Sequence, residues 1–590
     1  MCGFIGYFSH EKIDLKASAK SIIHRGPDQQ NISEGADWKI AFNRLSIIDK
    51  SNNAMQPFSY DGVKVFVNGE IYNYLELRKM YSKSYNCKTK SDVEIIPYLY
   101  RLKGINFLKE INGMFSMVII DEKLKLNYLI RDRFGKKPLF YVKKNDSLFF
   151  SSEIKALKYL LKLKLSKSNL ATYMSSGFLF EPLTSYENVF SILPGSYIKF
   201  EKSQLNEVQW YKPVIKQNNF DKKEIKKNFL QIFDQSIDFR LRSDVPVGIF
   251  LSGGLDSNLI LRNAIKKYPN LVSVICEIPQ KEKIANNFTD VKKPENICKE
   301  NNYKFIKTKF DFEYLNNNLI KIISKYDHPI LNSGILIFYR LAELAKENGI
   351  KVVLSGIGGD EIFGGYPWQD KLRIRNMVLK MKFFNKSQKN KKFFKISLIP
   401  NFLLNISKRF KRLLELIFEP HIWLMKCFGS DFQYPMNDMK NNIHAKLNEL
   451  SKKYYLITNN FFDKKKYNFI NYQNIYYSLS LQNYFSDQMC MMHSVENRAP
   501  LLDFKLFEFM MTVPEKYKIS KGSKKLQRDI CKYILPDYIL NSPKSGPSLP
   551  LNIWLENNAL KKDLFNYIQK NLYIIENNIS KDLAKSLKNY

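Results

Sequence analysis

Residues 245–257, VPVGIFLSGGLDS, are typical of a short buried strand that runs into a glycine-rich turn and then a helix. In the turn Ser252–Ser257, backbone N–H groups and the helix N-terminus can hold phosphates. A second apolar run, Lys351–Leu354, leads into another glycine-rich segment, SGIGGDE at 355–361. Two such strands predict a parallel α/β sheet with its ligand crevice at the carboxyl edge. The turn lacks the GK[ST] ending of a P-loop kinase or GTPase.

Two segments of different composition precede the residues of this predicted sheet. Residues 1–200 contain many short β-rich runs, such as Val63–Val67 before Asn68-Gly69. Residues 201–220 are polar and predict a linker. Apolar residues recur at helical spacing from Ile225 onward. We therefore expect a first domain at 1–200, a linker at 201–220 and a second domain at 221–590.

Cys2 is the most informative residue of the first domain. Removal of the initiator Met would leave a cysteine with a free α-amine. That amine has a reference pKa of about 7.7–8 and the thiol one of about 8.5, so the amine can act as the base for its own thiol. A lone cysteine here would more often be a small buried hydrophobe in a strand. The motifs downstream decide between these interpretations.

Five ordered motifs accompany Cys2: MCGFIG at 1–6, HRGPD at 24–28, NRLSIID at 43–49, NGEIYN at 68–73 and SDVE at 91–94. This series resembles the glutaminase domain of class II glutamine amidotransferases, which are N-terminal-nucleophile enzymes. The resemblance implies a layered αββα sandwich with Cys2 as the nucleophile. It also implies that Asn68 and Gly69 stabilise an oxyanion, and that Arg44, Glu70 and Asp92 bind glutamine.

Each of these residue types suits its implied role. The guanidinium of Arg44 offers a fork of donors to a carboxylate, and Asp92 suits the ammonium of a free amino acid. We expect Glu70 to contribute through its backbone. An amide N–H from Asn68 and the backbone N–H of Gly69 can stabilise an oxyanion. Taken alone, Asn68-Gly69 would instead predict a hairpin turn.

The second domain carries its own resemblance. SGGLDS at 252–257 resembles the pyrophosphate loop of ATP pyrophosphatases, and the whole chain is similar to the glutamine-hydrolysing asparagine synthetase family. The resemblance implies that ATP binds to Leu251, Ser252, Gly253, Gly254, Asp256, Ser257, Cys276, Ser355, Gly356 and Lys524. Lys524 would stabilise the departing pyrophosphate. Asp256 and Asp360 are hard oxygen ligands suited to Mg²⁺.

This family resemblance implies a ligase with two coupled half-reactions. Cys2 would release ammonia from glutamine, and the ammonia would pass through the protein to a carboxylate that ATP has converted into an acyl-adenylate. Aspartate is the expected acceptor. At position 357, however, aspartate-specific members typically have a Glu, and this chain has Ile357. A sugar uronate of a surface polysaccharide therefore stays open as an alternative acceptor.

Composition sets broader limits. A net charge of +36, from 93 Lys+Arg against 57 Asp+Glu, raises a non-enzymatic alternative, a nucleic-acid or membrane-surface binder. We disfavour it because the excess is spread along the chain and leaves the Cys2 and Asp256 motifs unexplained. The densest basic segment is 380–412. Scattered cysteines and the lack of a leader or an apolar span suggest a cytoplasmic protein. The oligomeric state stays open, with a homodimer as one option.

Overall fold

The computed structural model describes residues 2–176, 179, 181–213, 218–279, 292–330, 333–366, 479–518, 524–543, 549–551, 554, 558–578 and 581–588. The basic segment 380–412 lies outside these ranges. Within them, no helix combines the length and the apolar character that a membrane crossing requires.

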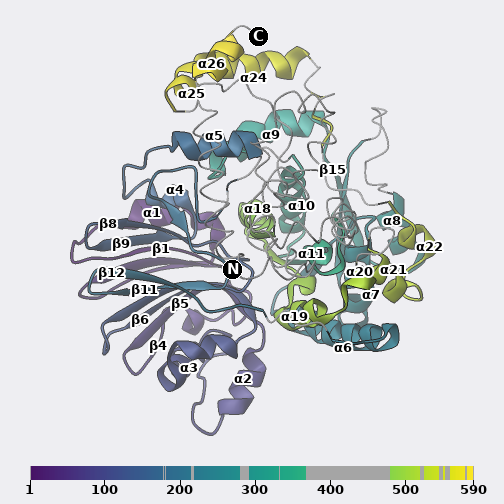
Figure 1. Ribbon diagram of the computed structural model, residues 1–590, viewed down its shortest axis with the longest axis horizontal. Coiled ribbons are helices and arrows are strands. Elements are labelled where there is room, and N and C mark those ends of the chain that lie inside the picture. Colours follow the sequence, from purple (N-terminus) through teal and green to yellow (C-terminus); the bar gives the residue numbers. More distant parts are fainter. Residues whose placement is uncertain are drawn as a thin grey trace, which may run out of the picture.

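The N-terminal part of the chain is a sandwich of two antiparallel sheets with helices on both outer faces (Figure 1). One sheet has the order β10-β8-β9-β1-β3-β2 and the other β12-β11-β7-β6-β5-β4. The strands are β1 (Cys2–Phe8), β2 (Gln29–Glu34), β3 (Trp38–Arg44), β4 (Phe58–Tyr60), β5 (Val63–Ile71), β6 (Gly113–Asp121), β7 (Leu126–Arg131), β8 (Phe140–Lys144), β9 (Ser147–Ser151), β10 (Phe190–Ser191), β11 (Ser196–Glu201) and β12 (Gln204–Gln209). Helices α1 (Lys16–Ser21) and α4 (Ile154–Leu157) lie over the first sheet, and α2 (Tyr74–Tyr81) and α3 (Ile96–Lys103) lie over the second. The predicted αββα sandwich is confirmed.

Strand alternation explains how β1 serves two cores at once. Phe4 and Phe8 point between the sheets with Cys2, whereas Ile5 and Tyr7 belong to the apolar cluster that contains α1 and α4 residues. A fully buried Phe contributes about 1.5–3 kcal/mol through the area it removes from water. The N-terminal strand is therefore held from both faces, and Cys2 is fixed with it.

The sheet continues beyond residue 200. Strand β12, at Gln204–Gln209, pairs along its whole length with β11. The segment predicted as a linker at 201–220 therefore contains a sheet strand. The described chain then reaches α6 (Lys222–Leu241), whose first turn is capped by Asp221 and Glu224 in a reciprocal capping box.

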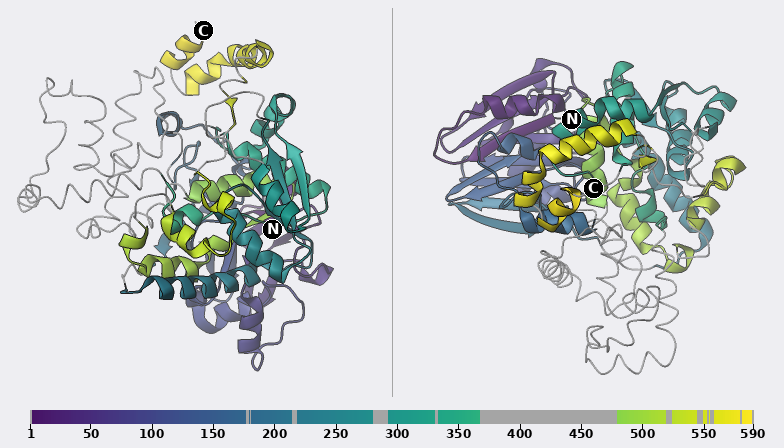
Figure 2. Two further views of the ribbon diagram at one scale, coloured as in Figure 1. Left: turned by 90° about the vertical axis from the view of Figure 1, so that its right-hand side faces the viewer. Right: turned by 90° about the horizontal axis from the view of Figure 1, so that it is seen from above.

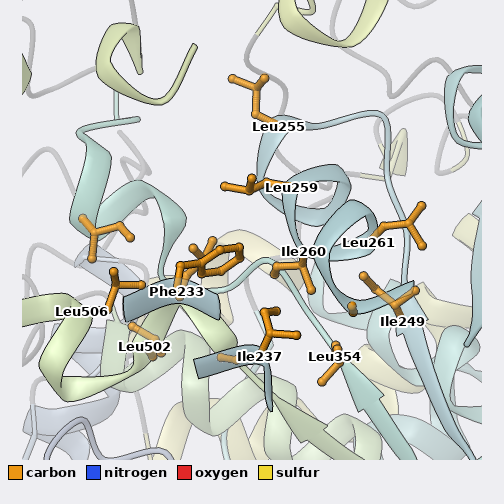
Figure 3. Close-up of a cluster of buried hydrophobic side chains, with 14 of the residues drawn as sticks. Phe233, Ile237, Ile249, Leu255, Leu259, Ile260, Leu261, Leu354, Leu502 and Leu506 are labelled. Carbon is orange, nitrogen blue, oxygen red and sulfur yellow. The ribbon is translucent and has the colours of Figure 1, made fainter. Parts of the chain in front are cut away.

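The second domain is built on a five-stranded parallel sheet with the order β15-β14-β13-β16-β17. Its strands are β13 (Val247–Phe250), β14 (Val272–Glu277), β15 (Phe305–Lys309), β16 (Val352–Leu354) and β17 (Glu496–Arg498). Its helices include α7 (Leu255–Lys267), α8 (Lys292–Glu300), α9 (Phe312–Lys325), α10 (Ile335–Glu347), α11 (Gly359–Phe363), α18 (Ser480–Met491), α19 (Phe504–Thr512) and α21 (Lys525–Cys531). A core from α6, α7, β13, β16 and α19 includes Phe233, Leu259 and Leu506 (Figure 3). The predicted α/β parallel-sheet domain is confirmed.

Helix α18 lies between the two domains. Its residues from Asn483 to Met491 are buried. Arg25 of the sandwich donates to Asp487 Oδ2 at 2.8 Å, and Lys137 Nζ donates to Asp487 Oδ1 at 3.1 Å. Tyr484 packs edge-on against Phe140. The helices α24 (Asn558–Lys570), α25 (Leu572–Asn578) and α26 (Lys581–Lys588) gather at one end of the molecule (Figure 2).

Candidate active sites

The first candidate site surrounds Cys2 at the start of β1. Its Cα pairs with that of Arg44 on β3, and its backbone N–H donates to Asn68 Oδ1 on β5 at 3.2 Å. Its carbonyl accepts from Arg25 Nε at 3.1 Å. Burial raises the pKa of the Cys2 thiol, although a backbone hydrogen bond from Leu45 and the charge of Arg44 act in the opposite direction. Residues from three strands thus meet around the thiol.

Asn68 and Gly69 lie inside β5 and not in a hairpin turn. They pair with Ser116 and Phe115 of β6. A side chain at Gly69 would place its Cβ 2.0 Å from the Met114 carbonyl oxygen, and its φ of +150° also favours glycine. Asn68 Nδ2 faces the hydroxyls of Ser116 and Ser152 at 3.2 and 3.5 Å. These two serines were not predicted, because no local pattern links them to Cys2.

Arg44 is buried and shapes the neighbouring loop. Its Nη1 donates to Gln29 Oε1 at 2.8 Å and to the Ser51 carbonyl at 2.7 Å, and Nη2 donates to the Asp49 carbonyl. The guanidinium therefore closes the loop after β3 beside Cys2. This arrangement places a fixed positive charge beside Cys2.

Asp92 and Glu70 form a buried acidic pair in the same candidate site. Asp92 Oδ2 accepts from the Ile71 N–H at 2.7 Å. Burial raises the pKa of Asp92 to about 6. Burial and the charge of Asp92 raise the pKa of Glu70 well above its ordinary value, and Arg498 opposes that shift. The Glu70 carboxylate faces the second domain, where Arg498 Nη2 lies 3.3 Å from its Oε2.

The second candidate site lies where β13 and β16 end. Lys524 Nζ pairs with Asp256 Oδ2 and lies 2.7 Å from Asp360 Oδ1. Burial disfavours the charge on Lys524, but the two carboxylates outweigh it and raise the Lys524 pKa. Gln527 Nε2 donates to Asp256 Oδ1 at 2.8 Å. The structure thus brings Asp256, Asp360 and Lys524 together and adds Gln527, which was not predicted as a site residue.

Two glycines make room for the Asp256 side chain. A Cβ at Gly359 would lie 2.0 Å from Asp256 Oδ1, and one at Gly356 would lie 2.9 Å from the Asp256 Cβ. The loop after β16 therefore packs directly against the Asp256 side chain. Ser355, at the start of that loop, donates its N–H to the Arg498 carbonyl at 2.9 Å. Its hydroxyl is buried and has no hydrogen-bond partner among the described residues.

Hydrogen bonds from its own side chains fix the conformation of the turn before α7. Ser252 N–H donates to Ser257 Oγ at 3.2 Å, and Gly254 N–H donates to Ser252 Oγ at 3.2 Å. Asn258 Nδ2 donates to the carbonyls of Ser252 and Gly254. Gly254 occupies the N-cap of α7 and adds no side-chain cap. The helix N-terminus can thus approach an anion, as a phosphate site requires.

Three other candidate ATP residues lie in or beside this turn. Gly253 follows Ser252 within it. Leu251 is buried, and its N–H donates to the Val274 carbonyl of β14 at 3.0 Å. Cys276 lies near the carboxyl end of β14, and burial raises its thiol pKa to about 12. The neighbouring strands β13 and β14 therefore bring Leu251 and Cys276 to the same edge of the sheet.

Comparison with known families gives the class: this is a ligase that joins a glutamine amidotransferase domain to an asparagine synthase domain. The glutamine amidotransferase domain model matches residues 1–211, and the asparagine synthase model matches residues 228–587. The chain belongs to the asparagine synthase family.

Individual relatives agree with this family. The chain is 30% identical to asparagine synthetase [glutamine-hydrolyzing] 1 of Bacillus subtilis, over 97% of this chain and 91% of that protein. It is 31% identical to a putative asparagine synthetase [glutamine-hydrolyzing] 2 of Methanocaldococcus jannaschii, over 62% of this chain and 76% of the relative. A relative with another name, amidase chry2 of Gibberella zeae, is 28% identical over 60% of this chain and 55% of its own length.

Proposed function

We propose that this enzyme converts aspartate into asparagine, with ammonia taken from glutamine and with aspartate activated as an acyl-adenylate. The observation that carries the proposal is the ion-paired cluster of Asp256, Asp360 and Lys524 beside the SGGLDS turn. Three charged side chains from distant parts of the chain converge there on a helix N-terminus. Their arrangement suits the triphosphate of ATP better than a structural ion pair, because two of the three remain partly exposed.

In the first half-reaction, the Cys2 sulfur adds to the carboxamide of glutamine. The thioester bond forms as the carbon–nitrogen bond breaks, ammonia leaves, and water then hydrolyses the thioester to glutamate. The hydrogen bond from the Cys2 backbone nitrogen to Asn68 Oδ1 would orient the α-amine that takes the thiol proton. Arg44 would bind the substrate carboxylate, and Asp92 with Glu70 would bind its ammonium.

In the second half-reaction, an oxygen of the acceptor carboxylate attacks the α-phosphorus of ATP and pyrophosphate leaves. The turn 252–257 and the N-terminus of α7 would hold the phosphates. Lys524 would stabilise the charge that develops on pyrophosphate. Ammonia then attacks the acyl carbon and AMP leaves, which gives the amide.

The residues present also fit a divalent cation. Asp256 and Asp360 supply hard oxygen donors, and side-chain-free Gly359 and Gly365 leave space beside their carboxylates. A bound Mg²⁺ would neutralise phosphate charge during adenylation. We propose that these two aspartates hold it against the phosphates.

Ammonia must travel between the sites without meeting bulk water, where it is mostly protonated and not nucleophilic. The domains contact each other along α18 through buried ion pairs of Asp487 with Arg25 and Lys137. This tight junction supports transfer inside the protein. We also propose a cytoplasmic location, where Cys2 would stay reduced. The homodimer stays a prediction.

The pH dependence tests the glutamine pocket. Burial raises the pKa of Asp92 to about 6, and only the ionised carboxylate attracts an ammonium group. The KM for glutamine should therefore rise as the pH falls through about 6, and it should level off above this range. Glutaminase kinetics between about pH 5 and 8 would measure this. Asp92→Asn should show a high KM without that inflection; a wild-type KM that stays flat over the whole range would count against the assignment.

Position 357 bears on which carboxylate the enzyme amidates. Ile357 is half-buried against the core of the second domain, so it offers no polar group to an acceptor. Glu361 lies four residues further along and is the nearest carboxyl in sequence after Asp360 that could act as a base instead. It is buried and accepts a hydrogen bond from Tyr366 at 2.5 Å. A uronate acceptor is therefore the second candidate, because such a substrate would not need the missing carboxylate.

A screen for pyrophosphate release with aspartate and uronates separates the two acceptors, and Ile357→Glu sharpens it. If aspartate is the acceptor, the variant should keep aspartate turnover equal or raise it, by up to about 10²-fold, because a base is restored. Val352→Ile in the neighbouring strand β16 serves as a control for crowding of the same core. Activity on a uronate alone, lost in Ile357→Glu, would overturn the aspartate proposal.

A further inference from the structure

Arg498 crosses from the second domain into the glutamine site of the first. It ends β17, an edge strand of the parallel sheet, and its side chain is fully buried. Nη1 donates to the carbonyls of Arg240 and Arg242 at 2.9 and 2.6 Å, and Nε donates to Glu496 Oε1 at 2.5 Å. These contacts within the second domain fix the plane of the guanidinium.

The remaining nitrogen of this guanidinium faces Glu70. Arg498 Nη2 lies 3.3 Å from Glu70 Oε2. Glu70 Oε1 is buried and has no hydrogen-bond partner among the described residues. One carboxylate oxygen thus lies beside the guanidinium of the second domain, and the other has no donor among the described residues.

The charged groups around Glu70 indicate which kind of donor its second carboxylate oxygen could bind. Glu70, Asp92 and Glu496 are all buried within one interacting group, in which Arg498, Lys137 and the amino terminus of the chain supply positive charge. Burial and the charge of Asp92 raise the pKa of Glu70, so the charged form of this carboxyl is disfavoured unless a further cation lies beside it. A buried carboxylate of this kind is stabilised by a proton or by a ligand cation.

We propose that Arg498 is a positioning residue that completes the glutamine site from the other domain by holding the Glu70 carboxylate in place and aimed at the substrate ammonium. The inference rests on the proposed function. Asp92 is anchored within the sandwich by the Ile71 N–H, whereas Glu70 is anchored by Arg498 alone among the described residues. Tight glutamine binding then requires the second domain to be docked.

The test compares two nitrogen sources in the full-length protein. Arg498→Met should raise the KM for glutamine by about 10- to 100-fold and change kcat less, because a binding carboxylate loses its position. The KM for ammonium chloride, followed by pyrophosphate release, should shift by less than about threefold because that substrate bypasses the glutamine site. Arg498→Lys should recover part of the glutamine affinity.

The pH profile gives a readout that a purely structural role would not move. Without the guanidinium, Glu70 still faces Asp92, Glu496 and the amino terminus, and its carboxyl should keep its proton to higher pH. The KM for glutamine in Arg498→Met should therefore fall more steeply with rising pH than in the wild type. The control is Arg242→Met, because Arg242 also pairs across the domains, with the exposed Glu76. It should leave the KM for glutamine unchanged.

Glu70→Gln decides the question if Arg498→Met does not fold. The substitution keeps the shape of the side chain and removes its charge, so it should raise the KM for glutamine and spare the reaction with ammonium. An unchanged KM for glutamine in the folded variants, or an equal loss with both nitrogen sources, would overturn the inference. A wild-type enzyme that uses ammonium but releases no glutamate from glutamine would overturn the proposed function and the inference together.

Discussion

Cys2→Ala should lower glutamine-dependent amidation by at least about 10³-fold, because the substitution removes the sulfur that forms the thioester. Ammonium-driven synthesis should persist, since it needs only the second site. The domain should also stay folded. Cys2 is buried, but the loss of one sulfur atom from a strand held by Phe4 and Ile5 costs only about 1 kcal/mol. Glutamate release measures the reaction at Cys2, and pyrophosphate release with ammonium measures the reaction at the second site.

Cys87→Ala is the matched control for this experiment. Cys87 belongs to the same domain and is half-buried against the α3 side of the sandwich, away from Cys2. Its loss should leave both nitrogen sources equally effective. Glutamine turnover that survives in Cys2→Ala at the wild-type rate would exclude Cys2 as the nucleophile.

The backbone of both domains could be predicted where the signal is local. The run Val245–Leu251 predicted a strand, and β13 occupies Val247–Phe250 within it. The helical spacing from Ile225 likewise matches α6. Asn68-Gly69 shows the limit of local signals, because the pair is common in turns but here continues β5. Pairing with β6 outweighs the turn preference, and that pairing depends on residues more than 40 positions away.

The sites depend even more on distant contacts. Lys524 meets Asp256 across 268 positions of sequence, and only a family resemblance could nominate it. Gln527 follows Lys524 by one turn of a helix and reaches the same carboxylate, yet no pattern in the sequence marks it. Arg25 and Asp487 form a buried pair across 462 positions. Such pairs are set by how the domains pack, so periodicity and propensity carry no information about them.

A second large effect is expected at the cluster of Asp256, Asp360 and Lys524. Asp256→Asn should lower pyrophosphate release by at least about 10²-fold with either nitrogen source, because adenylation precedes the use of ammonia. The amide is the same size as the carboxylate, and its oxygen can still accept from Gln527. Steric fit against Gly356 and Gly359 is therefore preserved. The change removes the charge that pairs with Lys524 and that would help to hold Mg²⁺.

Two comparisons make the Asp256→Asn result specific. Asp234→Asn alters an exposed carboxylate of the same domain that pairs with Lys267 on the surface, and it should leave synthesis unchanged. Glutaminase activity should survive in Asp256→Asn, since Cys2 and its partners are untouched. Loss of both activities would point to unfolding, which a thermal melt would reveal. Undiminished ATP-dependent synthesis would mean that Asp256 and Lys524 form only a structural ion pair, and that the phosphates are bound elsewhere on the sheet edge.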